Sequence, residues 1–294
     1  MRSPLRFQMR LILSLSLIVL ASLASCRPAP GDSATATKQE NTYQRVVRTG
    51  VIRAAYLSYP PACMKDPKTG KLTGTFVEIL EKIAENSGLK IEWTEEVGWG
   101  SQIEGLEAGR YDLVGSPVWA NPTRGKLTTL SSPVYFSGIG IYVRSDDNRF
   151  DNDWTKINSP DARVVTIDGE TGDLIARTQF PKAQRVSLPQ LSDISQLFLE
   201  VSSKKADVLF AEPYFAKQYF KSNPANLKNI AAARPIRVLG NCYMAKKNEF
   251  QFKQLIDTAL QDLLNSGYVT QVLAKYEGGD TFYEVAKPYQ PKGN

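Results

Sequence analysis

The chain has 294 residues, of which 42% are hydrophobic and 22% are charged, a balance typical of globular proteins with a sizeable core. It contains no histidine, which excludes Ser-His-Asp and Cys-His nucleophilic sites and every histidine-ligated metal site. The formal net charge is +6, but three of the arginines lie in the first ten residues and no dense Lys/Arg run follows. The sequence therefore predicts no nucleic-acid partner.

The first 26 residues are typical of an export signal. Residues 1–10 are basic, and residues 11–24 form an apolar run shorter than the roughly twenty residues that a membrane-spanning helix needs. The run closes with Leu-Ala-Ser-Cys at positions 23–26, which resembles the lipobox of bacterial lipoproteins. We predict a lipoprotein signal peptide over residues 1–25, a lipid on Cys26 and a flexible tether over residues 26–42. The alternative is an ordinary signal peptide, with Cys26 a plain thiol.

Strands and helices alternate along the first part of the folded body. Strands are predicted at residues 51–56, 90–94 and 111–114. Between them, Phe76, Ile79, Leu80 and Ile83 follow the spacing of one buried helix face, and Ile103 and Leu106 mark a shorter helix. This β-α-β-α-β order predicts a mainly parallel sheet with helices on both faces.

The same order recurs further along the chain, without a repeat of residues. Strands are predicted at residues 136–144, 163–167, 206–211 and 242–245. Helices are predicted to open at Thr171 and to cover residues 191–201 and 252–264. A second α/β unit with its own sheet is therefore expected.

Polar side chains follow the predicted strand at residues 111–114. The strand is expected to end in Gly115-Ser116-Pro117, after which the chain leaves regular structure and delivers Trp119, Asn121 and Arg124. Ligands of open α/β sheets bind beyond the carboxyl ends of strands, and arginine holds a carboxylate with two parallel hydrogen bonds. These residues predict a binding surface, although Trp119 alone is equally compatible with a place in the core.

Several ordered segments resemble the bacterial extracellular solute-binding proteins of family 3, the polar amino-acid receptors of ABC importers. The likeness covers roughly residues 45–280, and its segments are residues 50–55, 59–61, 73–79, 99–106, 109–113 and 122–124. The resemblance implies an α/β, periplasmic-binding-protein-like fold of type II. Two lobes, each with a parallel-rich sheet flanked by helices, would enclose a cleft and be joined by two hinge crossings. Lobe 1 would comprise residues 43–135 and 241–288, lobe 2 residues 136–240, and the tail residues 289–294.

The resemblance also implies a binding site. It assigns Arg124 and Thr171 to the ligand's α-carboxylate, Glu212 to its ammonium group, and Tyr59 and Trp99 to its side chain. Asn121 and Trp119 complete the expected site. Glu212 stands where the family usually has aspartate, and Trp119 stands where small residues are usual, so the identity of the ligand stays open. An aromatic face also suits a cationic ligand.

The expected function is that of a monomeric, lipid-anchored receptor at the periplasmic or extracytoplasmic face, which delivers a small polar solute to an ABC permease. No cofactor, metal or catalytic residue is expected. The alternatives are a ligand-sensing subunit of a signalling system and a dehydratase with Glu212 as general acid. Cys63 and Cys242, both assigned to lobe 1, either form a disulfide or stay as separate buried thiols.

Overall fold

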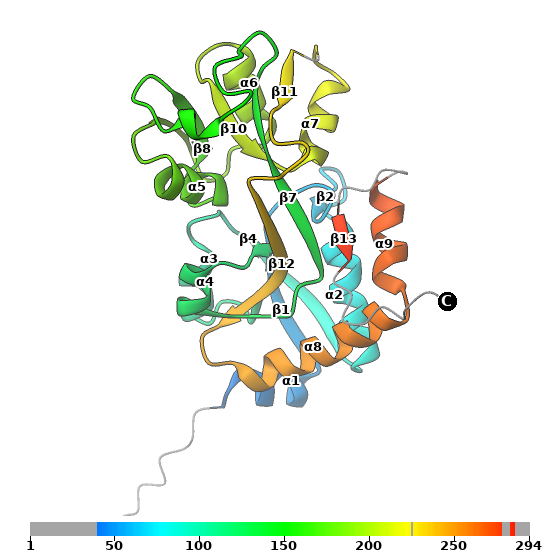
Figure 1. The fold of residues 1–294 in the computed structure, drawn as a ribbon. Helices are drawn as coiled ribbons and strands as arrows, with labels where there is room; N and C mark the ends of the chain where they lie inside the picture. The colour runs from blue at the N-terminus through cyan, green and yellow to red at the C-terminus, as the bar shows by residue number, and fades with distance from the viewer. Residues whose placement is uncertain (1–39, 225, 278–282, 286–294) are drawn as a thin grey trace, which may run out of the picture. The chain divides into compact units, whose positions relative to one another are not determined.

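The strands of the chain form one continuous mixed sheet together with a small separate hairpin (Figure 1). The fold comes from a computed structural model, which describes residues 40–224, 226–277 and 283–285. The predicted signal peptide, Cys26 and the tail at residues 289–294 lie outside the described residues. Within the described part, no helix is long and apolar enough to cross a membrane.

Two half-sheets with the same strand order make up this sheet. In the first half-sheet three parallel strands end against an antiparallel fourth, in the order β4 (Lys90–Glu96), β1 (Val51–Tyr56), β5 (Leu113–Trp119) and β12 (Arg237–Lys246). The second repeats this arrangement in the order β9 (Gln184–Leu188), β8 (Arg163–Ile167), β10 (Val208–Ala211) and β7 (Tyr135–Arg144). The long strands β7 and β12 pair with each other and run between the two half-sheets (Figure 1). The predicted α/β class is confirmed, and the two expected sheets are joined into one through β7.

The remaining strands are short. They are β6 (Thr128–Leu130) on β12, β11 (Leu227–Asn229) and β13 (Tyr283–Val285) on β7, and the separate hairpin of β2 (Met64–Lys65) and β3 (Leu72–Thr73). The predicted lobe boundaries stay a prediction.

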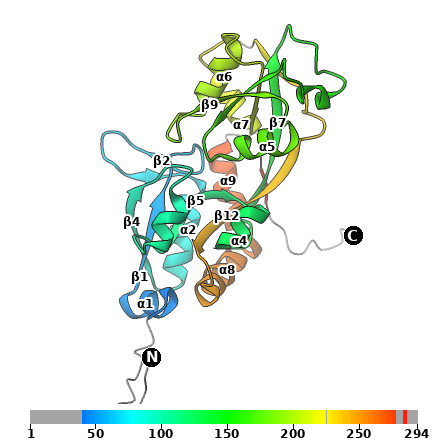
Figure 2. The same ribbon diagram turned by 90° about the vertical axis from the view of Figure 1, so that its left-hand side faces the viewer.

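Helices accompany both half-sheets (Figure 2). Those near the first are α1 (Thr42–Thr49), α2 (Thr75–Asn86), α3 (Gln102–Glu107), α4 (Pro122–Leu127), α8 (Phe250–Asn265) and α9 (Tyr268–Glu277). Those near the second are α5 (Thr171–Gln179), α6 (Ser195–Ser202), α7 (Pro213–Phe220) and the 3-10 helix Trp154–Ile157. The predicted apolar face of α2 is fully buried, and one apolar core extends from α2 and β1 to β8, β10 and α7. Each fully buried leucine or isoleucine contributes roughly 1.5–3 kcal/mol to folding.

The folded body was expected to begin at residue 43, and α1 begins at Thr42, where Asn41 and Gln44 form a capping box. Two other local details differ from the predictions. Strand β5 does not end at residues 115–117. It continues to Trp119, opposite β12, and Pro117 is tolerated because the β5–β12 register is interrupted nearby. Strand β9 was missed because only two of its five side chains are half-buried, so it carries little apolar signal.

The two half-sheets share one kind of ion pair, formed by a buried aspartate and a partly exposed arginine. Asp112 directly precedes β5 and accepts a hydrogen bond from the Arg53 backbone N–H of β1 at 2.7 Å. Asp207 directly precedes β10 and accepts one from the Arg163 backbone N–H of β8 at 2.9 Å. Each aspartate also pairs with the side chain of that same arginine. The structure thus contains a repeat that the sequence analysis did not detect.

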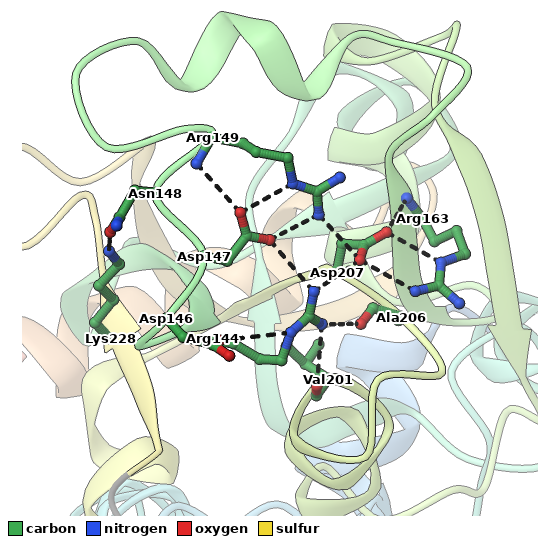
Figure 3. Close-up of polar contacts among 10 residues, drawn as sticks. All are labelled: Arg144, Asp146, Asp147, Asn148, Arg149, Arg163, Val201, Ala206, Asp207 and Lys228. Carbon is green, nitrogen blue, oxygen red and sulfur yellow. Dashed lines mark hydrogen bonds and ion pairs between the residues drawn. The ribbon is translucent and has the colours of Figure 1, made fainter.

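Asp207 has further cationic partners (Figure 3). Arg144 and Arg149 each place a guanidinium nitrogen 3.0 Å from its Oδ1 atom. Burial alone would raise the pKa of Asp207, but hydrogen bonds from Arg163 and Arg144 outweigh it and hold that pKa well below its usual value.

Cys63 and Cys242 are separate buried thiols, so the structure contains the second of the two alternatives predicted for them. Cys63 packs with Tyr56, Leu72 and Val77, whereas Cys242 lies on β12 opposite Val118. Because both are buried, the pKa of Cys63 is raised to about 11 and that of Cys242 to about 12.

Candidate functional site

Glu212 is a buried carboxyl group at the end of β10, where the sequence predicted an acid. Its side chain is 1% exposed, because the strand delivers it directly into the interior at the N-cap of α7. The Oε2 atom accepts hydrogen bonds from the phenols of Tyr59 at 3.2 Å and Tyr283 at 3.3 Å. The Oε1 atom is buried and has no hydrogen-bond partner among the described residues. One carboxylate oxygen is therefore held in place and the other is unsatisfied.

Arg124 lies on the short helix α4 beside the start of α5. Its Nη1 atom donates to the Trp119 carbonyl at 3.1 Å and to Thr171 Oγ1 at 3.4 Å. Thr171 is the first residue of α5, as predicted, and is 3% exposed. Arg124 forms no ion pair within the described chain. Burial lowers its pKa, although the negative charge of Glu170 acts to raise it. The guanidinium and the Thr171 hydroxyl are thus adjacent, as two donors to one anion would be.

Asn121 does not present its amide oxygen to this site. Its Oδ1 atom accepts the Arg124 backbone N–H at 2.9 Å and caps α4. Pro122 at the first helical position also favours helix formation here. Asn121 therefore helps to position Arg124, and its expected contact with a ligand stays a prediction.

Aromatic rings surround Tyr59. Those of Trp99, Trp119 and Phe215 stand edge-on to it, with centroids at 5.4, 6.4 and 4.7 Å. Trp119 is 7% exposed and packs in a core cluster with residues of β7 and β10, but its Nε1 atom has no hydrogen-bond partner in the described part of the chain. Because Trp119 also accepts from Arg124 through its carbonyl, it joins the guanidinium to the aromatic cluster around Glu212.

Glu170 is a second buried acid that the sequence analysis did not single out. Its Oε2 atom accepts the Gly172 backbone N–H at 2.5 Å, so Glu170 caps α5 directly before Thr171. Its position at a strand-to-helix turn predicts a cap from sequence, but only the fold places it where it experiences the charges of Arg124 and Glu212.

Both acids have a raised pKa. Burial raises the pKa of Glu212 to about 7, although the neighbouring Ser137 and the hydrogen bonds from Tyr59 and Tyr283 favour its charged form. Burial also raises the pKa of Glu170 to about 7, although the hydrogen bond from the Gly172 N–H and the positive charge of Arg124 act to lower it. The site therefore contains one guanidinium and two carboxyl groups that exchange protons near neutral pH, a chemistry suited to binding a zwitterion or a cation and to general acid catalysis.

A cavity of about 500 Å³ adjoins the aromatic cluster. Its walls include Trp99 and Phe215, the loop at residues 191–195 and several residues of α7, but neither Arg124 nor Glu212. The two half-sheets meet close by, where the Gly100 N–H donates to Gln190 Oε1 at 3.0 Å. The described residues contain no group of three or more side chains arranged to hold a metal ion.

Comparison with known proteins identifies the family. Residues 51–279 match the family model described as bacterial extracellular solute-binding proteins, family 3. The chain belongs to this family. The resemblance predicted from the ordered segments is therefore confirmed, and family 3 membership makes this an extracytoplasmic solute-binding protein with an α/β binding-protein fold.

Two family relatives and one solved structure illustrate the range of similar proteins. A probable amino-acid ABC transporter-binding protein of Haemophilus influenzae is 38% identical over 91 residues, which is 31% of this chain and 35% of that protein. A cyclohexadienyl dehydratase of Pseudomonas aeruginosa is 24% identical over 241 residues, which is 81% of this chain and 87% of that enzyme. The crystal structure of the ancestral amino acid-binding protein AncCDT-1, a precursor of cyclohexadienyl dehydratase, superposes with a TM-score of 0.69 at 23% identity, covering 81% of this chain and 99% of that one.

Proposed function

We propose that this protein is the solute receptor of an amino-acid ABC importer, and that it binds an amino-acid-like ligand between its two half-sheets. Arg124 and Thr171 would hold the ligand's carboxylate, and Glu212 Oε1 would accept its ammonium group. Tyr59 and Trp99 would contact its side chain. One observation carries this proposal. The Arg124 guanidinium has no ion pair in the described chain, and Glu212 Oε1 is buried without a hydrogen-bond partner. Trp119 and Tyr59 join these two groups into one cluster.

Charge complementarity supports this assignment. A zwitterion presents one anionic and one cationic group, and the two clamps come from different half-sheets, Arg124 after β5 and Glu212 after β10. Closure of lobe 1 (residues 43–135 and 241–288) on lobe 2 (residues 136–240) would complete both pairs at once. The receptor would act as a monomer.

A thermal-shift screen of residues 27–294 tests the proposal. The panel comprises amino acids, polyamines, quaternary amines and small carboxylates, because a ligand that binds only the native state raises Tm by mass action. We expect an amino acid to raise Tm. If carboxylates that lack an amine raise Tm instead, only the carboxylate-binding role of Arg124 is supported. If amines that lack a carboxylate raise Tm instead, only the cation-binding role of Glu212 is supported.

The anchor is a separate part of the proposal. Cys26 would carry the lipid, so cells grown with a clickable fatty acid should label the full chain and not its Cys26→Ala variant. Equal labelling of both would contradict the anchor without affecting the binding site.

A dehydratase is the second candidate. Glu212 and Glu170 exchange protons near pH 7, as a general acid must, and one relative is named as a dehydratase. Mass spectrometry of a cyclohexadienyl substrate after long incubation distinguishes the two functions. A product lighter by one water would favour the enzyme, and we expect the substrate to be recovered unchanged.

A further inference from the structure

The C-terminal strand β13 lies beside the candidate site. It pairs antiparallel with β7, Tyr283 opposite Ser137 and Val285 opposite Tyr135. The Tyr283 backbone N–H also donates to Glu277 Oε1 at 2.8 Å, and Glu277 is the buried last residue of α9. The strand is therefore held by the sheet along its length and by α9 at its first residue.

The Tyr283 side chain is fixed by packing. It is 3% exposed, its ring lies 4.6 Å from that of Tyr135, and the ring of Tyr214 is 6.5 Å away. A tyrosine in such a cluster loses little further freedom when its hydroxyl makes a hydrogen bond. That hydroxyl donates to Glu212 Oε2 at 3.3 Å.

We propose that Tyr283 is a positioning residue of the binding site: together with Tyr59 it occupies Oε2 of Glu212 and so presents Oε1 to the ligand's cationic group. This inference rests on the proposed function, because it assumes that Glu212 receives a cation. It assigns to the C-terminal strand a role in ligand recognition that the resemblance did not suggest.

The two phenols reach Glu212 from different elements. Tyr59 follows β1 of the first half-sheet, whereas Tyr283 is carried by a strand that pairs with β7 of the second. Tyr283 therefore does not depend on the Tyr59 loop to hold Oε2. With one phenol removed, the carboxylate would lose a donor that favours its charged form and part of the restraint on its rotation.

Other groups also face Glu212 and bear on a pH-dependent test. Ser137 of β7 and Trp119 of β5 are polar neighbours that favour its charged form. The ionisable groups that interact with it electrostatically are Tyr59, Tyr135 and Tyr142, Glu170 before α5, and Tyr283. Of these, only Tyr59 and Tyr283 have a hydroxyl hydrogen-bonded to the carboxyl group.

The first experiment titrates the carboxyl group without ligand. Carbon-13 NMR of protein labelled at the glutamate carboxyl carbons, with the Glu212 signal assigned from Glu212→Gln, follows its ionisation in wild type and in Tyr283→Phe. We expect Tyr283→Phe to raise the pKa of Glu212 from about 7 by roughly one unit, a tenfold change in its ionisation equilibrium. Tyr135→Phe is the matched control, since it removes a neighbouring buried hydroxyl that is not bonded to Glu212 and should cause a smaller shift.

The second experiment titrates the twenty proteinogenic L-amino acids singly against the same proteins. For an amino acid that wild type binds, a one-unit rise lowers the ionised fraction of Glu212, so Tyr283→Phe should bind about fivefold more weakly at pH 7 but less than twofold more weakly at pH 8.5. A purely structural role would weaken binding equally at both pH values.

The outcomes separate the two ideas. If wild type binds amino acids and Tyr283→Phe shows an unchanged Glu212 titration and unchanged binding, the positioning role is wrong and the proposed function stands. If wild type binds none of them, the proposed function fails, and the role of Tyr283 in presenting Oε1 to a cation fails with it.

Discussion

At the scale of single residues, the site combines one guanidinium with two buried acids. Arg124 donates to Thr171 and to the Trp119 carbonyl, yet has no ion pair within the described chain. Glu170 lies close enough for its charge to favour the protonated guanidinium. Arg124 therefore keeps its proposed role in ligand binding, whereas Glu170 acts on it through its charge.

Arg124→Ala should lower ligand affinity well over tenfold. Removing one partner of a desolvated charge pair costs roughly 2–5 kcal/mol, and the ligand's carboxylate would be left without its cation. Isothermal titration calorimetry measures the loss, and Tm without ligand should change little. Lys126→Ala, an exposed cation on the same helix, is the control; equal losses in both variants would show a general charge effect instead.

Glu170→Gln should change the pH dependence of stability while keeping an acceptor for the cap of α5. The pKa of Glu170 is raised to about 7 in the fold, so the unfolded chain loses its proton first as pH rises from about 4. The protonated Glu170 carboxyl group makes its full contribution to stability below pH 4, and this contribution is lost as pH approaches 7. Urea unfolding at pH 4.5 and 7.5 should show a smaller pH-dependent decrease in Glu170→Gln than in wild type, by about 1–3 kcal/mol. An identical decrease in both proteins would show that Glu170 is not the group responsible.

At the scale of elements, the paired aspartates fix corresponding strands in the two half-sheets. Asp112 connects β5 to β1, and Asp207 connects β10 to β8, each through the backbone and the side chain of one arginine. Both strands deliver site residues at their far ends, Trp119 from β5 and Glu212 after β10. These ion pairs therefore help to set the positions of candidate site residues that they do not touch.

Asp207→Asn should destabilise the fold by about 2–3 kcal/mol at pH 7. This lies below the roughly 3–5 kcal/mol for breaking a buried pair, because Arg149 and Arg163 are partly exposed and can be solvated. The pKa of Asp207 is lowered in the fold, so its stabilisation is complete above the ordinary carboxyl pKa of about 3.9 and is lost as pH falls below it. Chemical unfolding should show a smaller difference from wild type at pH 3 than at pH 7. A difference that grows on acidification would contradict the sign of this linkage.

At the scale of the whole described fold, Gly169 and Gly100 bring the loop before α5 against the loop that follows β4. A Cβ atom on Gly169 would lie 3.0 Å from the backbone Cα and N atoms of Gly100. Gly169 also has a φ of +78°, which side chains rarely adopt. The loop before α5 can therefore meet residues 99–100 only without a side chain.

Gly169→Ala should weaken ligand binding severalfold, because it disfavours the closed arrangement that a ligand between the half-sheets needs. Small-angle X-ray scattering should also show less ligand-induced compaction than in wild type. Gly88→Ala is the matched control for backbone strain, since Gly88 has a φ of +68° and nothing within 4 Å of its Cβ position. If both variants lose affinity alike, strain rather than close approach is the cause.

Much of the fold and part of the site could be predicted from the sequence. Apolar periodicity identified the buried face of α2, and strand patterns placed Glu212 after β10 and Thr171 at the start of α5. The sequence was less informative where a polar residue could either cap a helix or belong to the site. Asn121 was expected to be a site residue and caps α4, whereas Glu170 was not singled out and lies within the charge cluster.

The sequence by itself determined the fold class, the family and the residue types available for binding, because periodicity and turn chemistry depend on near neighbours in the chain. Only the tertiary structure decided which distant groups meet. Tyr59 and Tyr283 are 153 and 71 residues from Glu212, yet both donate to the same carboxylate oxygen. Burial at that meeting point raises the pKa of Glu212 to about 7, and burial depends on the packing of several elements rather than on any local pattern.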